Sequence, residues 1–329
     1  MRVFVAGATG VIGRPLVDRL LAAGHDVTAM TRSPEKAAAL RARGADAVVA
    51  DALDAQATRA AVAAARPEVV VNELTDLPDA IDPRTYEEAL AGTNRLRREA
   101  TPTLAAAARE AGARRLISQS VSFMLRPDGP GVADEDAPLW VDPPRALASG
   151  VASTAALEQA TVGADGIEGI VLRYGFFYGP GSTYAPDGHT SRELARRRFP
   201  IVGGGAGLTS FIHVDDAADA TLLALDRGTL GIYNITDDEP VAAREWIPAM
   251  AAAMRAKPPR RVPLWLAKLL VGPLAETMVR GKGASNARAR AAFGWAPAHP
   301  TYREGFPEVF GPAGAGDAAA GRHSGASVH

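Results

Sequence analysis

The chain has 329 residues, 47% of them hydrophobic, which is enough for a large core or for one main domain with a smaller lobe. Its net charge of −1 gives no basic excess typical of nucleic-acid-binding proteins, and its lack of cysteine excludes disulfides, thiolate nucleophiles and cysteine-ligated metals. Because Met1 leads directly into the first apolar run, we expect no secretory signal. The longest apolar stretch, residues 262–279, is interrupted by charges, glycine and proline, so it predicts a helix over a substrate cleft and no membrane span.

The first half of the chain alternates short apolar runs with Ala-, Leu- and Arg-rich helical patterns, as a series of β-α-β units does. The expected strands, in chain order, are Arg2–Ala6, Asp26–Met30, Ala47–Val49, Val69–Val71, Arg115–Ser118 and Gly169–Arg173. The expected helices are Gly10–Ala23, Pro34–Arg43, Tyr86–Ala111 with a kink or restart at Pro102, and Ser149–Val162. Residues 126–144, rich in Pro, Gly and Asp, predict a loop beside a cleft.

This order predicts an α/β fold: a Rossmann doubly wound parallel sheet with helices on both faces, plus a smaller C-terminal α+β substrate lobe. We place the Rossmann domain at residues 1–175, interleaved with the lobe, and the lobe at residues 176–310. Short strands are expected in the lobe at Phe211–Val214 and Tyr233–Ile235. Residues 311–329 are rich in Gly, Ala and Ser and predict a disordered tail.

The strongest motif is the glycine turn at residues 5–13, VAGATGVIG, which follows the first strand and opens the first helix. Gly7 permits a tight turn, Gly10 lets a pyrophosphate approach the backbone, and Gly13 lets helix and strand pack closely. The spacing is GxxGxxG where the usual fingerprint is GxGxxG. The turn predicts that a dinucleotide contacts Gly7, Thr9, Gly10, Val11, Ile12 and Gly13.

The end of the second strand favours NADP(H) over NAD(H). An acidic residue there accepts from the free ribose hydroxyl of NAD, whereas this chain has Arg32, whose guanidinium suits a 2′-phosphate. The alternative is a solvated loop arginine. Further cofactor contacts are expected at the ends of the third and fourth strands: Asp51, Ala52, Leu53, Glu73 and Leu74. An N-cap role would also explain Asp51, and burial at a strand end would raise the pKa of Glu73.

Several stretches in the right order give the chain a resemblance to the short-chain dehydrogenase/reductase superfamily, and within it to the extended or atypical NAD(P)-dependent epimerase/dehydratase branch. They are the glycine turn, RLISQS at residues 115–120, LRYGFFYGPG at residues 172–181, FIHVDDA at residues 211–217, YNI at residues 233–235 and FGWAP at residues 293–297. The resemblance spans about residues 1–310. It predicts the fold with more force than it predicts the reaction.

Typical members of this superfamily use a serine and a YxxxK pair, in which the lysine ammonium stabilises the phenolate of the tyrosine. The resemblance places Gly150 at the tyrosine position and Thr154 at the lysine position of this chain, and it keeps the serine as Ser120. Ser120 is therefore the first catalytic candidate. Tyr174 and Tyr178 are the replacement candidates for the acid, although packing would explain both.

Other residues of suitable chemistry receive weaker functional readings. His213 and the following aspartates have metal-ligating types, but three or four convergent ligands are required and the family precedent is packing, so we assign no metal. Aromatic and apolar residues at expected cleft positions favour a small hydrophobic substrate: Phe123, Met124, Trp140, Phe176 and Phe177.

Three hypotheses follow. The first is an NADP(H)-dependent oxidoreductase or epimerase/dehydratase-like enzyme acting on a small organic molecule. The second is a non-redox isomerase, dehydratase or cyclase on the same scaffold, and the third is a catalytically silent NADP(H) sensor or binding protein. The Ala/Arg-rich, Lys-poor composition is typical of a GC-rich bacterial genome and fits a cytoplasmic enzyme; a homodimer is one arrangement that the sequence leaves open.

Overall fold

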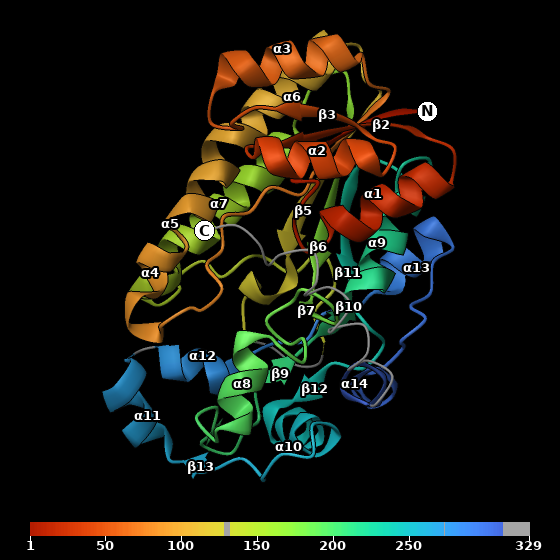
Figure 1. Ribbon diagram of the computed structural model, residues 1–329. Helices are drawn as coiled ribbons and strands as arrows, with labels where there is room; N and C mark the ends of the chain where they lie inside the picture. Colours follow the sequence, from red (N-terminus) through yellow and green to blue (C-terminus); the bar gives the residue numbers. More distant parts are fainter. Residues whose placement is uncertain (128–131, 273, 312–329) are drawn as a thin grey trace.

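The computed structural model describes residues 1–127, 132–272 and 274–311, and within them a seven-stranded sheet forms the centre (Figure 1). All its strands are parallel, in the order β3-β2-β1-β4-β5-β6-β11. Their bounds are β1 Arg2–Ala6, β2 Asp26–Thr31, β3 Asp46–Val49, β4 Val69–Asn72, β5 Arg115–Val121, β6 Glu168–Tyr174 and β11 Gly231–Ile235. This confirms the predicted Rossmann sheet. Apart from Gly311, the predicted tail lies outside the described residues.

Helices cover both faces of the sheet, as predicted (Figure 1). One face is covered by α1 Gly13–Ala22, α2 Pro34–Ala42 and α9 Val214–Leu223, the other by α3 Ala55–Ala65, α6 Thr101–Glu110 and α7 Arg145–Val162. The alternation of side chains along a strand supplies both layers. In β1, Val3 and Val5 pack in the core beneath α1, whereas Phe4 and Ala6 pack in the core beneath α6.

The predicted helix 86–111 is in the right place but is divided into four pieces. They are α4 Tyr86–Ala89, α5 Ala91–Arg95, a π-helical turn Leu96–Ala100, and α6. Pro102 stands in the first turn of α6 and cannot donate a backbone hydrogen bond, so the wide turn directly before it accommodates the missing donor. The predicted restart at Pro102 is confirmed, since α6 begins at Thr101, whereas the break at Leu90 and the π-helical turn were not predicted.

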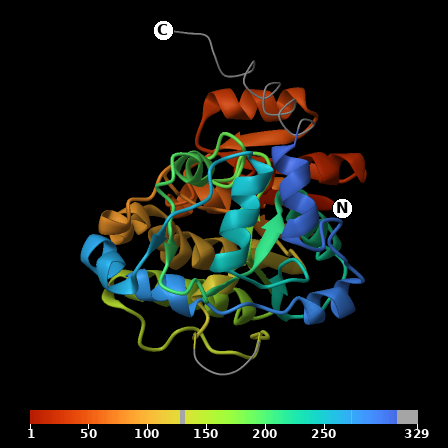
Figure 2. The same ribbon diagram turned by 90° about the horizontal axis from the view of Figure 1, so that it is seen from below.

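The C-terminal lobe is built from three short strand pairs and six helices in the described part of the chain. The pairs are β7 Phe176–Tyr178 with β10 Phe211–His213, β8 Ile201–Val202 with β13 Arg261–Val262, and β9 Leu208–Thr209 with β12 Val241–Ala242. The helices are α8 His189–Ala195, α10 Ala243–Ala253, α11 Leu264–Val271, α12 Leu274–Arg280, α13 Ala287–Phe293 and α14 Tyr302–Phe310. Figure 2 shows cyan α10 beside blue α14, and aromatic side chains pack around this pair.

The chain crosses between the two parts more often than the predicted boundary at residue 175 implies. The expected lobe strand Tyr233–Ile235 is the end of β11, which extends the central sheet beside β6. α9 packs against α1, and Phe293 of α13 lies in the same core. The correction has a physical reason: the exposed edge of β6 is covered by pairing with an apolar strand from the later chain. No described helix is both long and apolar enough to cross a membrane.

Candidate functional site

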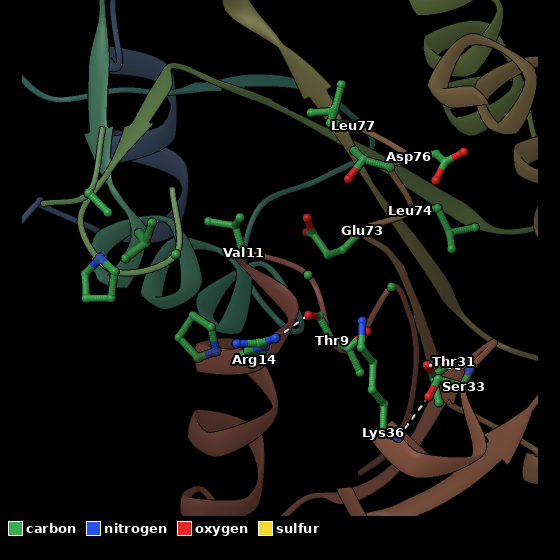
Figure 3. A pocket seen from close by; sticks show the side chains of 18 of the residues that line it. Thr9, Val11, Arg14, Thr31, Ser33, Lys36, Glu73, Leu74, Asp76 and Leu77 are labelled. Atoms are coloured by element: carbon green, nitrogen blue, oxygen red, sulfur yellow. Dashed lines mark hydrogen bonds between the residues drawn. The ribbon is translucent and has the colours of Figure 1, made fainter. Parts of the chain in front are cut away.

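A cavity of about 1160 Å³ lies at the carboxyl ends of the central strands (Figure 3). Its walls are the glycine turn after β1, the ends of β2, β3 and β4, the loop at residues 180–187, the start of α9 and part of α14. Ligand crevices of open α/β sheets occur at this edge. The cavity is therefore the candidate site of the molecule.

The structure brings most of the predicted cofactor contacts to this cavity. The predicted residues that line it are Gly7, Thr9, Gly10, Val11, Arg32, Asp51, Ala52, Glu73 and Leu74. Three others lie behind it: Ile12 is buried in the core, Gly13 is packed against the turn, and Leu53 contacts the core on the other face of the sheet. Asp51 accepts a hydrogen bond from the N–H of Leu53, whereas Asp54 caps α3.

The glycine turn fits a dinucleotide in its backbone geometry. Gly7 has a φ of 87°, and a Cβ there would lie 2.4 Å from the carbonyl oxygen of Glu73. A Cβ at Gly13 would lie 2.2 Å from the carbonyl oxygen of Gly7, so only glycine permits this close packing. The backbone N–H groups of Val11 and Ile12 have no hydrogen-bond partner among the described residues. The turn thus offers free donors at the start of α1, where an anion is stabilised.

Cations gather at the end of the cavity beyond β2. Arg32 is 62% exposed in its side chain and pairs with Asp76 at 3.2 Å. Arg14, Lys36 and Arg43 line the same cavity, Arg43 forms an ion pair with Asp18, and Ser33 caps the N-terminus of α2. Sequence reasoning missed these three cations; Lys36 lies in the first turn of the helix that directly follows Arg32, which was an available signal. The donor set suits a phosphate group.

Glu73 is a buried carboxyl group beside the glycine turn. It is 3% exposed; Tyr174 donates to its Oε1 at 3.1 Å, and its Oε2 has no partner in the described part of the chain. Burial raises the pKa of Glu73 to about 8. Figure 3 shows its side chain pointing from the end of β4 toward the turn that carries Val11. At neutral pH it is therefore a protonated acid next to the predicted phosphate site.

The hydroxyl group of Ser120 is engaged within the protein. Its Oγ donates to Oε1 of Glu158 at 2.8 Å, and Arg173 holds the same carboxylate through two bonds of 2.7 Å. All three residues are buried. Because a serine hydroxyl has one proton, Ser120 in this arrangement can accept a hydrogen bond but has no proton left to donate.

The two tyrosines predicted as replacement acids both lie in cores. Tyr174 is fully buried against α9, where its hydroxyl lies 2.6 Å from Oγ1 of Thr221. Tyr178 is fully buried among lobe aromatics such as Phe211 and Phe306. Burial raises the pKa of each hydroxyl well above its usual value. Neither tyrosine lines the large cavity.

The positions that resemblance assigns to tyrosine and lysine lie one turn apart on α7. Gly150 is buried, and a Cβ there would lie 3.3 Å from Cε of Met124, a tight contact with the flexible end of that side chain. Oγ1 of Thr154 donates to the carbonyl of Gly150 at 2.9 Å. The two positions thus supply no acid, no base and no cation from their own side chains.

The predicted cleft aromatics do not line the large cavity. Phe123 stacks on Phe176 with ring centroids 4.3 Å apart, and Phe123 is 37% exposed. Met124 and Trp140 belong to the apolar cluster that includes Val151, and Cε of Met124 lies close to Gly150. They form an apolar cluster beside α7.

A second polar cluster joins the start of α9 to α14. Ligand atoms of His213, Asp216 and His299 lie within 4.8 Å of one another. Nδ1 of His299 lies 2.9 Å from Asp216, and its Nε2 lies 3.2 Å from Glu308. The hydrogen bond with Asp216 raises the pKa of His299 to about 9. A charged imidazole already occupies the carboxylate, so the cluster is arranged as a salt link.

Comparison with known proteins supports a common family. The model of the NAD dependent epimerase/dehydratase family matches residues 3–236. A Streptomyces protein named 3-diazoavenalumate denitrifying reductase is 50% identical over 309 residues, which cover 93% of this chain and 99% of that protein. A ketoreductase from Stigmatella aurantiaca is 31% identical over 252 residues, covering 75% of this chain and 71% of that one.

Solved structures agree with the observed fold. The UDP-glucose 4-epimerase of Thermus thermophilus, solved as a complex with NAD, has a TM-score of 0.72 and 25% identity, over 94% of this chain and 98% of that chain. The match extends from the glycine turn through the C-terminal lobe. The chain belongs to the NAD-dependent epimerase/dehydratase family and is an oxidoreductase- or epimerase-like enzyme.

Proposed function

We propose that this protein is an NADP(H)-dependent reductase that delivers hydride to a small organic electrophile without protonating it from a side chain. The large cavity would hold the dinucleotide, with its pyrophosphate at the glycine turn. Named relatives with reductase and ketoreductase activities support the redox reading over the isomerase, dehydratase or cyclase reading and over the silent sensor.

The cations beyond β2 support NADP(H) as the cofactor. Arg32 and Lys36 would hold the 2′-phosphate, together with the capped start of α2. The ion pair between Arg32 and Asp76 is largely exposed, so it contributes little and a phosphate can replace it. Glu73, Leu74 and Asp51 would contact the rest of the dinucleotide.

The state of two positions on α7 carries the proposal. Gly150 and Thr154 stand where the resemblance expects a proton-transferring pair, whereas the glycine turn keeps a geometry that would suit a dinucleotide. Ser120 would then act by orienting the Glu158–Arg173 pair, and Tyr174 and Tyr178 by packing. A reduction that requires no proton from the enzyme fits such a site.

The Streptomyces relative indicates which electrophile has this property, since its name describes removal of nitrogen from a diazo-substituted carboxylate. Bound NADPH would supply a hydride, and a diazonium carbon that accepts the hydride becomes C–H as dinitrogen leaves, a balance that needs no proton. The apolar side chains of Phe123, Met124 and Trp140 would hold the organic part of the substrate. We therefore propose a diazo-bearing organic acid as the substrate class.

An isotope experiment tests this function. The protein is incubated with 3-diazoavenalumate and NADPH that carries deuterium at the transferred position, in light water. The proposal predicts one deuterium in each product molecule and one dinitrogen released for each NADPH oxidised. Deuterium that enters only from heavy water, or nitrogen loss without NADPH oxidation, would contradict it and favour the non-redox alternative.

A further inference from the structure

Arg97 is a buried cation without a carboxylate partner. Arg97 is only 7% exposed. In the described part of the chain its side chain makes one hydrogen bond, from Nη1 to Oγ1 of Thr154 at 3.0 Å. None of the ion pairs among the described residues includes it. A guanidinium has five N–H groups, so most of its hydrogen-bonding capacity is unused.

The backbone places Arg97 against Thr154 of α7. It lies in the π-helical turn Leu96–Ala100, an irregularity that is frequent at functional sites. Thr154 and Gly150, the residues opposite it on α7, are bonded to each other. Asn94, one turn earlier, accepts from Ser153 at 2.8 Å and so fixes the two helices together. The cation missing from α7 is thus present on the neighbouring helix.

The surroundings do not neutralise Arg97. Glu158 is the nearby carboxylate that acts on its charge, but both oxygens of Glu158 are bound by Arg173, and one also accepts from Ser120. Tyr86 is the other titratable group that acts on it. Burial lowers the pKa of Arg97, which shows that desolvation outweighs these attractions. An unpaired buried charge destabilises a fold, so its retention calls for a ligand.

We propose that Arg97 binds a negatively charged oxygen of the substrate beside Gly150. The chemical class is an organic anion with a carboxylate or a phenolate oxygen. Gly150 contributes no side chain there, its neighbour is the flexible end of Met124, and Thr154 holds the guanidinium in place. This inference rests on the proposed function because it assigns an anion to the proposed substrate; dinucleotide binding is independent of it.

The test uses the full chain saturated with NADP⁺ and two probes, benzoate and the neutral benzamide, in calorimetric titrations. The wild type is expected to bind benzoate more tightly than benzamide. Arg97→Met, which keeps length and removes charge, is expected to weaken benzoate binding about tenfold or more and to leave benzamide unchanged. Arg95→Met is the matched control, because Arg95 is exposed and pairs with Glu99 on the same helix.

Thermal unfolding without any probe gives the second readout. Because an unpaired buried charge is removed, Arg97→Met is expected to melt at a temperature equal to or higher than that of the wild type. A purely structural Arg97 would give the opposite sign. A less stable variant, equal benzoate affinity in wild type and variant, or no preference of the wild type for benzoate would overturn the proposal. Failure of the wild type to bind NADP⁺ would instead contradict the proposed function.

Discussion

The first two glycines of the turn have different roles: Gly7 is required by the backbone geometry, whereas Gly10 borders the cavity. An alanine at Gly7 would need a φ of 87° and would bring Cβ to 2.4 Å from a backbone oxygen. An alanine at Gly10 would meet only the carbonyl of Gly7, at 3.3 Å, and Gly10 lines the cavity. The same methyl group therefore has different effects at the two positions.

We predict that Gly10→Ala changes stability by less than about 1 kcal/mol but weakens NADPH binding by about tenfold or more, since the methyl occupies the place of the pyrophosphate. Gly7→Ala is expected to cost about 3 kcal/mol or more in stability. Urea unfolding and fluorescence titration measure both. A Gly10→Ala protein that binds NADPH like the wild type would contradict the assigned position of the dinucleotide.

Glu73 makes stability depend on pH. Its pKa is about 8 in the fold against 4.5 for an exposed group, so the folded chain keeps a proton that the unfolded chain loses above about pH 4.5. Protonation of Glu73 makes its full contribution to the free energy of unfolding below about pH 4.5. That contribution is lost as the pH rises to about 8, by up to about 1.4 kcal/mol per pH unit.

Glu73→Gln cannot titrate. We therefore predict that the free energy of unfolding of Glu73→Gln rises relative to that of the wild type between about pH 5 and about pH 8, and that the difference is constant above that range. Asp237 and His299, whose pKa values are also raised to about 9, affect both proteins equally and cancel. Urea unfolding across this range measures the difference. Parallel stability curves for the two proteins would show that Glu73 ionises normally.

Residue-level prediction from the sequence succeeded where the signal is local. The glycine spacing and Arg32 identify the cavity because turn geometry and a strand end are encoded in adjacent residues. The bond of Ser120 to Glu158 was not predictable, because it joins a strand to a helix 38 positions later and depends on side-chain direction. The same reason hides Arg97, whose orientation depends on the π-helical turn.

At the scale of elements, strand existence followed from apolar periodicity, whereas strand partnership did not. β11 is short and its pattern equally fits a lobe strand, and only its pairing with β6 places it in the central sheet. Likewise, Pro102 predicted an interruption, but no local pattern distinguishes a kink from a π-helical turn.

The shared sheet predicts that the Rossmann part does not fold alone. A fragment of residues 1–175 lacks α9 and β11, so the core side chains beneath α1 and the edge of β6 would be exposed to water. We expect this fragment to unfold without a cooperative transition in circular dichroism, while a chain of residues 1–311 unfolds cooperatively. A cooperative transition of the short fragment would contradict the interleaved arrangement.

At the scale of the whole molecule, a nearly neutral chain brings several basic side chains to its cavity. The net charge is −1, and Arg14, Arg32, Lys36 and Arg43 line the cavity together with carboxylates, of which Asp76 pairs with Arg32 and Asp18 with Arg43. Local placement of charge, and not overall composition, thus supports a phosphorylated ligand. The lobe contributes His213 and Glu308 to the lining of the same cavity.

Titration of the purified protein with NADPH and with NADH, followed by cofactor fluorescence, tests the central claim most directly. The experiment compares the wild type, Arg32→Ala and the control Arg59→Ala. The control removes an exposed cation of α3 that pairs with Glu110. We predict that the wild type and the control bind NADPH about tenfold or more tightly than NADH, and that Arg32→Ala loses this preference with its NADH affinity unchanged. Equal affinities in the wild type, or an equal loss of both in Arg32→Ala, would contradict the account.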